Sequence, residues 1–168
     1  MNSDDEIYDV VDMNDQVIGQ ATRKEIHEKN LVHRSVHTLV FNPEGNLFLQ
    51  KRSLSKDENP GFWDTSSAGH VDSGEDYLTA ANRELSEELG ISEPLQPFMQ
   101  IKACEDSHWE HVIAYTCTTR QPIKINPVEI SEGRFWALNE IMETLAKKNN
   151  FFTSTFKIIF INYLKENP

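Results

Sequence analysis

The chain has 168 residues, 38% of them hydrophobic, and a formal net charge of −11 at pH 7. This length supports a single well-packed domain over residues 1–168, and the excess of acidic residues disfavours nucleic-acid polymers as partners, because their phosphates call for basic surfaces. Since no apolar run reaches the roughly 20 residues of a membrane span and the N-terminus is acidic, unlike a signal peptide, we expect a cytoplasmic protein without membrane association.

Strand-like runs alternate with a few helical segments along the chain. The β-rich runs cover residues 7–13, 16–21, 35–42, 46–52, 95–104, 111–119 and 133–138. Helical patterns cover residues 22–28, the segment between Ser73 and Gly90, residues 139–147, and a C-terminal helix with Phe156, Ile159, Phe160, Tyr163 and Leu164 on one side. The first hairpin and its short helix form an N-terminal unit over residues 1–31. The alternation predicts an α/β (α+β) fold with a mixed sheet covered on both faces.

The segment GHVDSGEDYLTAANRELSEELGI, which begins at Gly69, predicts a loop followed by an amphipathic helix. The loop is bounded by Gly69 and Gly74. Ser73 and Asp76 have the spacing of a capping box at the helix start, and Gly90 stands where helices commonly end. An apolar stripe at helical spacing would face the core, and it consists of Leu78, Ala81, Leu85 and Leu89.

Three carboxylates of this helix share one side. At about 100° per residue, Glu84, Glu87 and Glu88 fall within a sector of roughly 100° that points away from the leucines. Like charges one turn apart repel each other, and more strongly when water is excluded. Such a run taken alone is most often a solvated surface. A hard divalent cation, Mg²⁺ or Mn²⁺, which prefers oxygen ligands, or the neighbouring Arg83 would compensate the charge.

This segment resembles the signature box of the Nudix hydrolases. It fits the pattern G-x5-E-x7-R-E-U-x-E-E-x-G-U without a mismatch, U being a bulky aliphatic residue. The matching positions are Gly69, Glu75, Arg83, Glu84, Leu85, Glu87, Glu88, Gly90 and Ile91. The resemblance implies an α/β/α sandwich with a mixed β-sheet. It also implies a hydrolase, dependent on Mg²⁺ or Mn²⁺, that cleaves the phosphoanhydride bond of a nucleoside diphosphate linked to another moiety.

The resemblance implies a metal site on the helix. The implied ligands are Glu84, Glu87, Glu88 and a backbone carbonyl near Gly69. A cation between carboxylates and substrate is physically required, because an acidic site would otherwise repel a pyrophosphate. Glu75 and Arg83 are implied to form a buried pair that ties the loop to the helix, and Gly74 and Gly90 to have structural roles.

A carboxylate within reach of a metal-bound water would act as general base. By its placement Glu88 is the first candidate, with Glu84 and Arg83 completing the catalytic group. Acids outside the helix stay open as alternative bases, namely Glu110, Glu129 and Glu132.

Segments outside the box resemble the Nudix branch that includes type I isopentenyl-diphosphate isomerases. These segments are His33-Arg34, residues 39–45, Lys51-Arg52-Ser53, residues 60–71 and residues 129–138. The isomerases, however, use a cysteine immediately before the Gly-His pair of this loop as acid and base, and Ala68 takes that position here. We therefore rank the isomerase below the hydrolase and keep it as an alternative, together with a non-catalytic Nudix domain that senses a nucleotide.

Histidines shared with that branch leave a second metal site open. His33 and His70 match histidines that ligate a metal in the isomerases, and Glu110 and His111 lie near the region that supplies carboxylate ligands there. Without the full ligand set, we interpret His33 and His70 as packing or hydrogen-bonding residues, with a substrate contact from His70 because it follows Gly69.

The group attached to the diphosphate is not specified by the sequence. We expect a small phosphorylated substrate, and Arg52 is the first candidate for its phosphates because it follows a strand into a loop. The substrate-contact candidates are Arg52, Lys51, His70 and Trp63, with Lys56 as a further basic residue. A homodimer is one option for assembly. Cys104 and Cys117 lie in β-like stretches and are expected to be buried reduced thiols.

Overall fold

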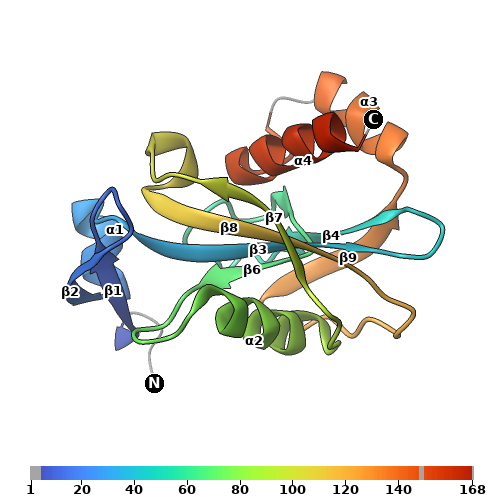
Figure 1. The fold of residues 1–168 in the computed structure, drawn as a ribbon. Helices are drawn as coiled ribbons and strands as arrows, with labels where there is room; N and C mark the ends of the chain where they lie inside the picture. Colours follow the sequence, from blue (N-terminus) through green and yellow to red (C-terminus); the bar gives the residue numbers. More distant parts are fainter. Residues whose placement is uncertain (1–4, 148–149, 168) are drawn as a thin grey trace.

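The structure is a computed structural model that describes residues 5–147 and 150–167. A mixed sheet forms the middle layer, with α2 (Tyr77–Leu89) on one face and α3 (Leu138–Lys147) and α4 (Ser154–Glu166) on the other (Figure 1). A hairpin of β1 (Ile7–Val11) and β2 (Val17–Thr22), followed by α1 (Arg23–Lys29), lies at one end of this sandwich. The predicted α/β/α arrangement is confirmed.

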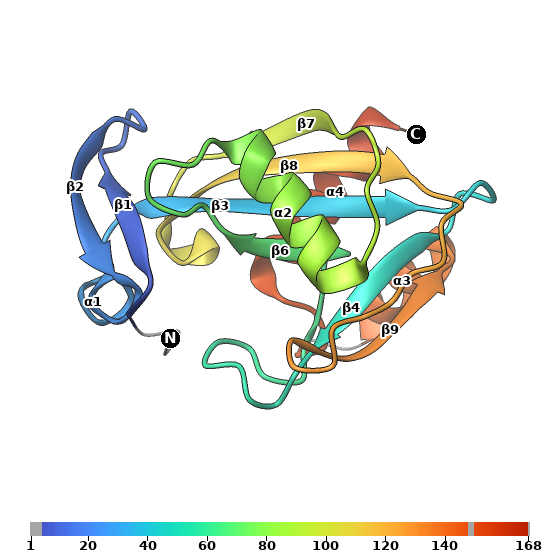
Figure 2. The same ribbon diagram turned by 90° about the horizontal axis from the view of Figure 1, so that it is seen from below.

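β3 (His33–Phe41) is the central strand of the sheet. It pairs in parallel with β8 (Glu110–Thr118) along one edge, and antiparallel with β6 (Ser67–His70) and then β4 (Leu47–Arg52) along the other. The outer strands are β5 (Trp63–Asp64), β7 (Gln96–Ile101) and β9 (Ile130–Trp136). β6 pairs with the first half of β3 and β4 with its end, so β6 and β4 diverge from each other beneath α2 (Figure 2).

The two faces of β3 carry the two cores, since successive strand residues point to opposite faces. Val36 and Val40 belong to the cluster under α2, whereas Leu39 and Phe41 belong to the cluster under α4. Fully buried aliphatic and aromatic side chains such as Phe156 fill these layers. Each contributes about 1.5–3 kcal/mol by removal of apolar surface from water.

The ends of α2 differ in part from the sequence expectation. Gly90 closes the helix in the left-handed conformation at φ 66°, as predicted. The N-cap, however, is Asp76, which accepts from Thr79 N at 2.9 Å. The predicted capping box is therefore wrong, because the hydroxyl of Ser73 donates instead to Asp9 of β1 at 2.8 Å. This bond ties the loop to the N-terminal hairpin.

Burial on α2 also corrects one apolar position. Leu78 is 47% exposed, while Ala80 joins Ala81, Leu85 and Leu89 in the core. The helix is rotated so that Ala80 faces the sheet, which leaves Leu78 at the solvent side.

The two cysteines have different environments. Cys117 on β8 is buried, as expected, and burial raises the pKa of its thiol to about 12. Cys104 is exposed, contrary to the expectation, because it caps the short 3-10 helix η2 (Glu105–Ser107) outside the sheet. Among the described residues, no helix combines the length and apolar character needed to cross a membrane.

Candidate active site

Arg83 joins the loop before α2 to the helix. Its Nε and Nη2 atoms donate to Glu75 Oε1 and Oε2 at 3.0 and 2.9 Å, and Nη2 also donates to the backbone carbonyl of His70 at 3.0 Å. Burial acts to raise the pKa of Glu75, but hydrogen bonds from Arg83 and from the Asp72 backbone outweigh it, so this pKa is lowered. The structure thus contains the expected Glu75–Arg83 pair, in a partly buried position.

Two carboxylates one turn apart on α2 are largely withdrawn from solvent. Glu88 is 4% exposed, and its Oε2 accepts from Ala68 N and Gln50 Nε2, both at 3.0 Å. Glu84 Oε1 accepts from Arg83 Nη1 at 2.6 Å. Burial, and then the nearby Glu88, raise the pKa of Glu84 to about 8, and burial raises the pKa of Glu88. The two groups therefore hold two negative charges readily only when a cation compensates them.

The absence of a side chain at Gly69 leaves the space that the Glu84 carboxylate occupies. A Cβ atom at this position would overlap that carboxylate, with Oε2 at 2.6 Å. Glu87 is more open, with 59% of its side chain exposed, and lies 3.5 Å from Arg83 Nη1. All three predicted ligands of α2 line the same cavity, and Gly69 does too. A set of carboxylate oxygens of this kind fits Mg²⁺ or Mn²⁺.

The cavity has a volume of about 630 Å³ and carries basic groups as well as acids. Arg52 lines it while donating to the Glu58 carbonyl at 2.9 Å. Lys56 also lines it and forms an ion pair with Glu129. Burial lowers the pKa of Lys56. The structure thus brings Arg52 and Lys56, which the sequence offers as candidates for phosphate contact, to the wall of this cavity.

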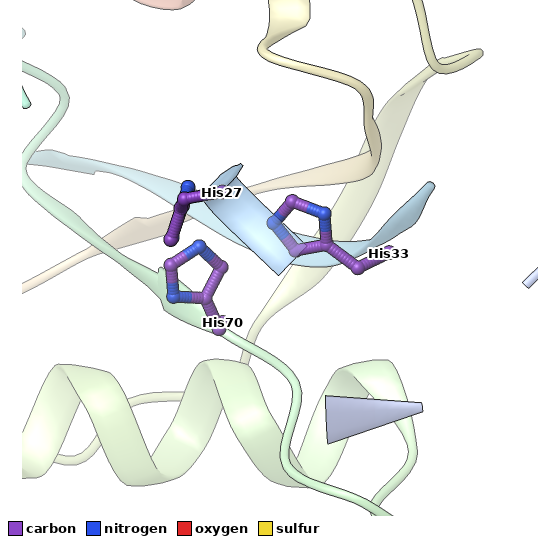
Figure 3. Close-up of side chains that lie close together, drawn as sticks. All are labelled: His27, His33 and His70. Carbon is purple, nitrogen blue, oxygen red and sulfur yellow. The ribbon is translucent and has the colours of Figure 1, made fainter. Parts of the chain in front are cut away.

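Three histidines from different elements meet beside the cavity, and one of them, His70, lines it. His27 of α1, His33 of β3 and His70 of β6 each offer a ring nitrogen, and these atoms lie within 4.8 Å of one another (Figure 3). Glu110 Oε1 lies 3.5 Å from His33 Nε2 and 3.2 Å from His70 Nε2. Burial acts to raise the pKa of Glu110, but the two histidines outweigh it and hold this pKa well below the usual range.

This histidine cluster could also hold a metal ion, because imidazole nitrogens and a carboxylate suit transition metals. His33 and His70 are positions that the isomerase resemblance singles out, and His27 is an addition from the structure. His111 is not part of the cluster. Its Nδ1 accepts from Ala103 N at 3.1 Å and its Nε2 lies 2.9 Å from the Asp12 carbonyl, so both nitrogens have structural partners.

Three of the predicted site residues do not line the cavity among the residues that the structure describes. They are Trp63, Lys51 and Glu132. Trp63 is 4% exposed and packs edge-to-face on Trp136, so it belongs to the core instead of contacting substrate. Lys51 lies 3.9 Å from Glu132, with 38% and 53% of the two side chains exposed. The cause is strand alternation, because Gln50 and Arg52 of β4 turn toward the site and Lys51 turns away.

The other alternative bases, Glu110 and Glu129, do line the cavity. Both are already paired, Glu110 with the histidines and Glu129 with Lys56. The hydrogen bonds that Glu88 accepts from Ala68 N and Gln50 Nε2 both use Oε2. Which of these carboxylates acts as general base stays a prediction.

The sequence profile of the NUDIX domain matches residues 31–156. The chain belongs to the Nudix family. It is similar to an uncharacterized Nudix hydrolase of Pseudomonas aeruginosa, with 37% identity over 134 residues and 79% of each chain covered. It is also similar to an isopentenyl-diphosphate Delta-isomerase of Pectobacterium atrosepticum, with 30% identity over 156 residues, covering 90% of this chain and 87% of the other.

Its fold is similar to the crystal structure of DR0079 from Deinococcus radiodurans. The TM-score is 0.81 at 26% identity, and the match covers 92% of this chain and 97% of that one. The Nudix hydrolase therefore combines an intact box with relatives in both the hydrolase and the isomerase groups.

Several residues of the Nudix hydrolase site were not found from the sequence. Gln50 and the Ala68 backbone hold Glu88, Asp9 holds the loop through Gly74 N and Ser73, and His27 completes the histidine cluster. These residues are distant in sequence, and their pairing is set by the β3–β6 register and the docking of the hairpin. Only Gln50 could have been found from the sequence, because it lies two residues before Arg52 in a predicted strand and therefore shares its face.

Proposed function

We propose that this Nudix hydrolase cleaves the phosphoanhydride bond of a nucleoside diphosphate linked to another moiety, using Mg²⁺ or Mn²⁺. The observation that supports this most directly is the pair of withdrawn carboxylates, Glu84 and Glu88, with raised pKa values, on the wall of a cavity that also carries basic groups. Such a pair is unfavourable without a cation and suited to one with it.

Each side chain has a role in this reaction. Glu84, Glu87 and Glu88 would hold the cation, which when bound would polarise the phosphate and lower the pKa of an attacking water. Glu88 is the first candidate to accept the proton of that water. Arg52 and Lys56 bind phosphate oxygens and orient the anhydride. Arg83 fixes Glu84 and the loop in place.

The test is a hydrolysis assay over a panel of nucleoside diphosphate derivatives with Mg²⁺ and with Mn²⁺. Glu84→Gln and Glu88→Gln keep side-chain size and remove the charge, so we expect loss of turnover by about 10²–10⁴-fold with the fold intact. Glu143→Gln on α3, away from the cavity, is the matched control. Wild-type turnover in both site variants would refute the proposal. Tight nucleotide binding without any product would favour the sensing alternative.

An isomerase is the second candidate, supported by the similarity to the Pectobacterium enzyme and by the approach of His33 and His70 to Glu110. Ala68 opposes it, since a methyl group can neither give nor take a proton at an allylic carbon. Incubation with isopentenyl diphosphate decides between the two. The hydrolase proposal predicts no double-bond shift, and formation of the dimethylallyl isomer would reassign the enzyme.

A further inference from the structure

The cavity continues from the carboxylates of α2 to the α4 side of the sheet. Ser35 and His37, two residues apart on β3, share this face and both line the cavity. In the β3–β6 register, Ser35 lies opposite His70 and His37 lies opposite Ala68. We call the part lined by Ser35, His37 and Ala68 the β3 recess.

His37 presents a hydrogen-bond acceptor to this recess. The hydroxyl of Thr65 donates to the Ser67 carbonyl at 3.2 Å, so its lone pair accepts from His37 Nδ1–H at 2.8 Å. Asp64 Oδ1, 4.0 Å from the same nitrogen, favours a proton there as well. The proton on Nδ1 leaves the lone pair on Nε2. Burial lowers the pKa of His37, which favours the neutral ring.

Among the described residues, the His37 ring forms its hydrogen bond through Nδ1, which leaves the Nε2 acceptor for a ligand. The second polar residue of the recess is Ser35. It is 2% exposed, and its Oγ atom has no hydrogen-bond partner among the described residues. A buried polar atom without a partner is costly, and it is uncommon outside functional sites. One such hydroxyl, two residues from an imidazole acceptor on the same strand face, indicates a ligand that supplies the missing partner.

The polarity of the other cavity-lining residues indicates which kind of ligand fits. Of the described residues that line the cavity, only Tyr8, Ala68 and Val128 bring aromatic or aliphatic side chains, and the others are polar, charged or glycine. A prenyl chain would leave polar groups desolvated and unpaired in such a site. A group rich in hydroxyls would satisfy them.

We infer that the β3 recess binds the group attached to the diphosphate and that this group carries hydroxyls, as a sugar does. His37 Nε2 accepts a hydrogen bond from one hydroxyl, and Ser35 Oγ exchanges hydrogen bonds with a second. Ala68, opposite His37 in the strand register, adds only a methyl group to this wall. This inference rests on the proposed function for the position of the diphosphate and adds the chemical class of its substituent.

The experiment compares two probes with the same nucleotide and the same carbon count in the variable group: ADP-ribose and the pentyl ester of ADP. Binding is measured by calorimetry in Ca²⁺, which takes the same oxygen ligands as Mg²⁺. We expect the wild type to bind ADP-ribose at least about tenfold more tightly than the pentyl ester, because the pentyl chain leaves the polar groups of the recess unpaired. Turnover of both probes with Mg²⁺ is measured in parallel.

Three variants assign this preference to the recess. His37→Asn keeps a donor toward Thr65 but lacks the Nε2 acceptor, so the preference should fall by most of its value. His37→Gln places an amide oxygen near Nε2 and should restore part of it. Ser35→Ala removes a hydroxyl without a protein partner, so it should lower the preference while leaving the melting temperature unchanged or raised. Ser86→Ala, on the exposed side of α2, should change neither.

Equal binding of the two probes, binding of neither, tighter binding of the pentyl ester or of isopentenyl diphosphate, or an unchanged preference in His37→Asn and Ser35→Ala would each overturn the inference. These outcomes are separable from failure of the proposed function. A preference for ADP-ribose in Ca²⁺ without turnover of any diphosphate of the panel in Mg²⁺ or Mn²⁺ would remove the hydrolase and keep the recess. Turnover of other diphosphates with equal binding of the two probes would do the reverse.

Discussion

Gly69→Ala tests the position of a carboxylate while leaving every ligand in the sequence. The added methyl group would overlap the carboxylate of Glu84, as the Cβ position shows. Because that carboxylate ends a flexible side chain, it can turn away without a shift of the backbone. The variant should therefore fold, but with Glu84 displaced from the cation site and from Arg83.

The size of the effect follows from what Glu84 loses. In the metal-free protein, loss of its hydrogen bond to Arg83 costs about 1.5–3 kcal/mol, partly offset by weaker repulsion from Glu88, so we expect a net loss of about 1–2 kcal/mol in unfolding free energy. Displacement of a ligand should weaken Mg²⁺ binding by about 10–100-fold. At a Mg²⁺ concentration of 100 times the wild-type Kd, stabilisation by the ion would fall from about 2.7 kcal/mol by about 1.3–2.3 kcal/mol.

The assay is denaturant unfolding with and without Mg²⁺, together with kcat/KM. Gly19→Ala on β2 is the matched control, since a Cβ there meets no atom within 4 Å. A Gly69→Ala protein with the wild-type response to Mg²⁺ and wild-type turnover would refute the assignment of Glu84 as a ligand. Loss of folding in the absence of metal would refute the premise that only the side chain has to move.

Three further predictions concern stability. Arg83→Lys should lower the unfolding free energy by about 2–4 kcal/mol, because lysine cannot form both the bidentate hydrogen bond with Glu75 and the hydrogen bond to the His70 carbonyl. Denaturant titration measures this change, and a loss below about 0.5 kcal/mol would contradict the prediction. The folded-state pKa of Glu84, about 8, lies above its unfolded value. Without metal, the stability of the wild type relative to Glu84→Gln should therefore fall as pH rises from about 5 to about 8. Calorimetry that showed a rise over this range would contradict the raised pKa. Phe156→Ala should lower the unfolding free energy by about 3–5 kcal/mol, because the ring is fully buried under the sheet. A smaller loss in urea unfolding would contradict this and would mean that neighbouring side chains fill the space left by the ring.

The local part of the site could be predicted from the sequence. Gly90 ends α2, and Glu84 and Glu88 share a side, because these relations depend only on helix geometry. The pairing of Arg83 with Glu75 was implied by the resemblance to the Nudix box. The mixed sheet was likewise indicated by alternation and turn residues. The short strands β5 and β6 were not, since two and four residues carry too little pattern.

The remaining features depend on contacts between distant segments. Ser73 fits a capping box by spacing, yet Asp9 of the hairpin takes its hydroxyl. Trp63 stands beside the box in the sequence, yet the packing of Trp136 places it in the core. His27 shows no motif of its own, and only the docking of α1 brings it to His33 and His70. No local pattern encodes these placements.

The most direct test of the central claim is an anomalous-difference map from a crystal of the protein soaked in Mn²⁺. The account predicts a peak bounded by the carboxylates of Glu84 and Glu88, with Glu87 turned toward it, and the disappearance of that peak in Glu84→Gln. A map with no ion at this position, while the carboxylates stay protonated or turn into solvent, would contradict it.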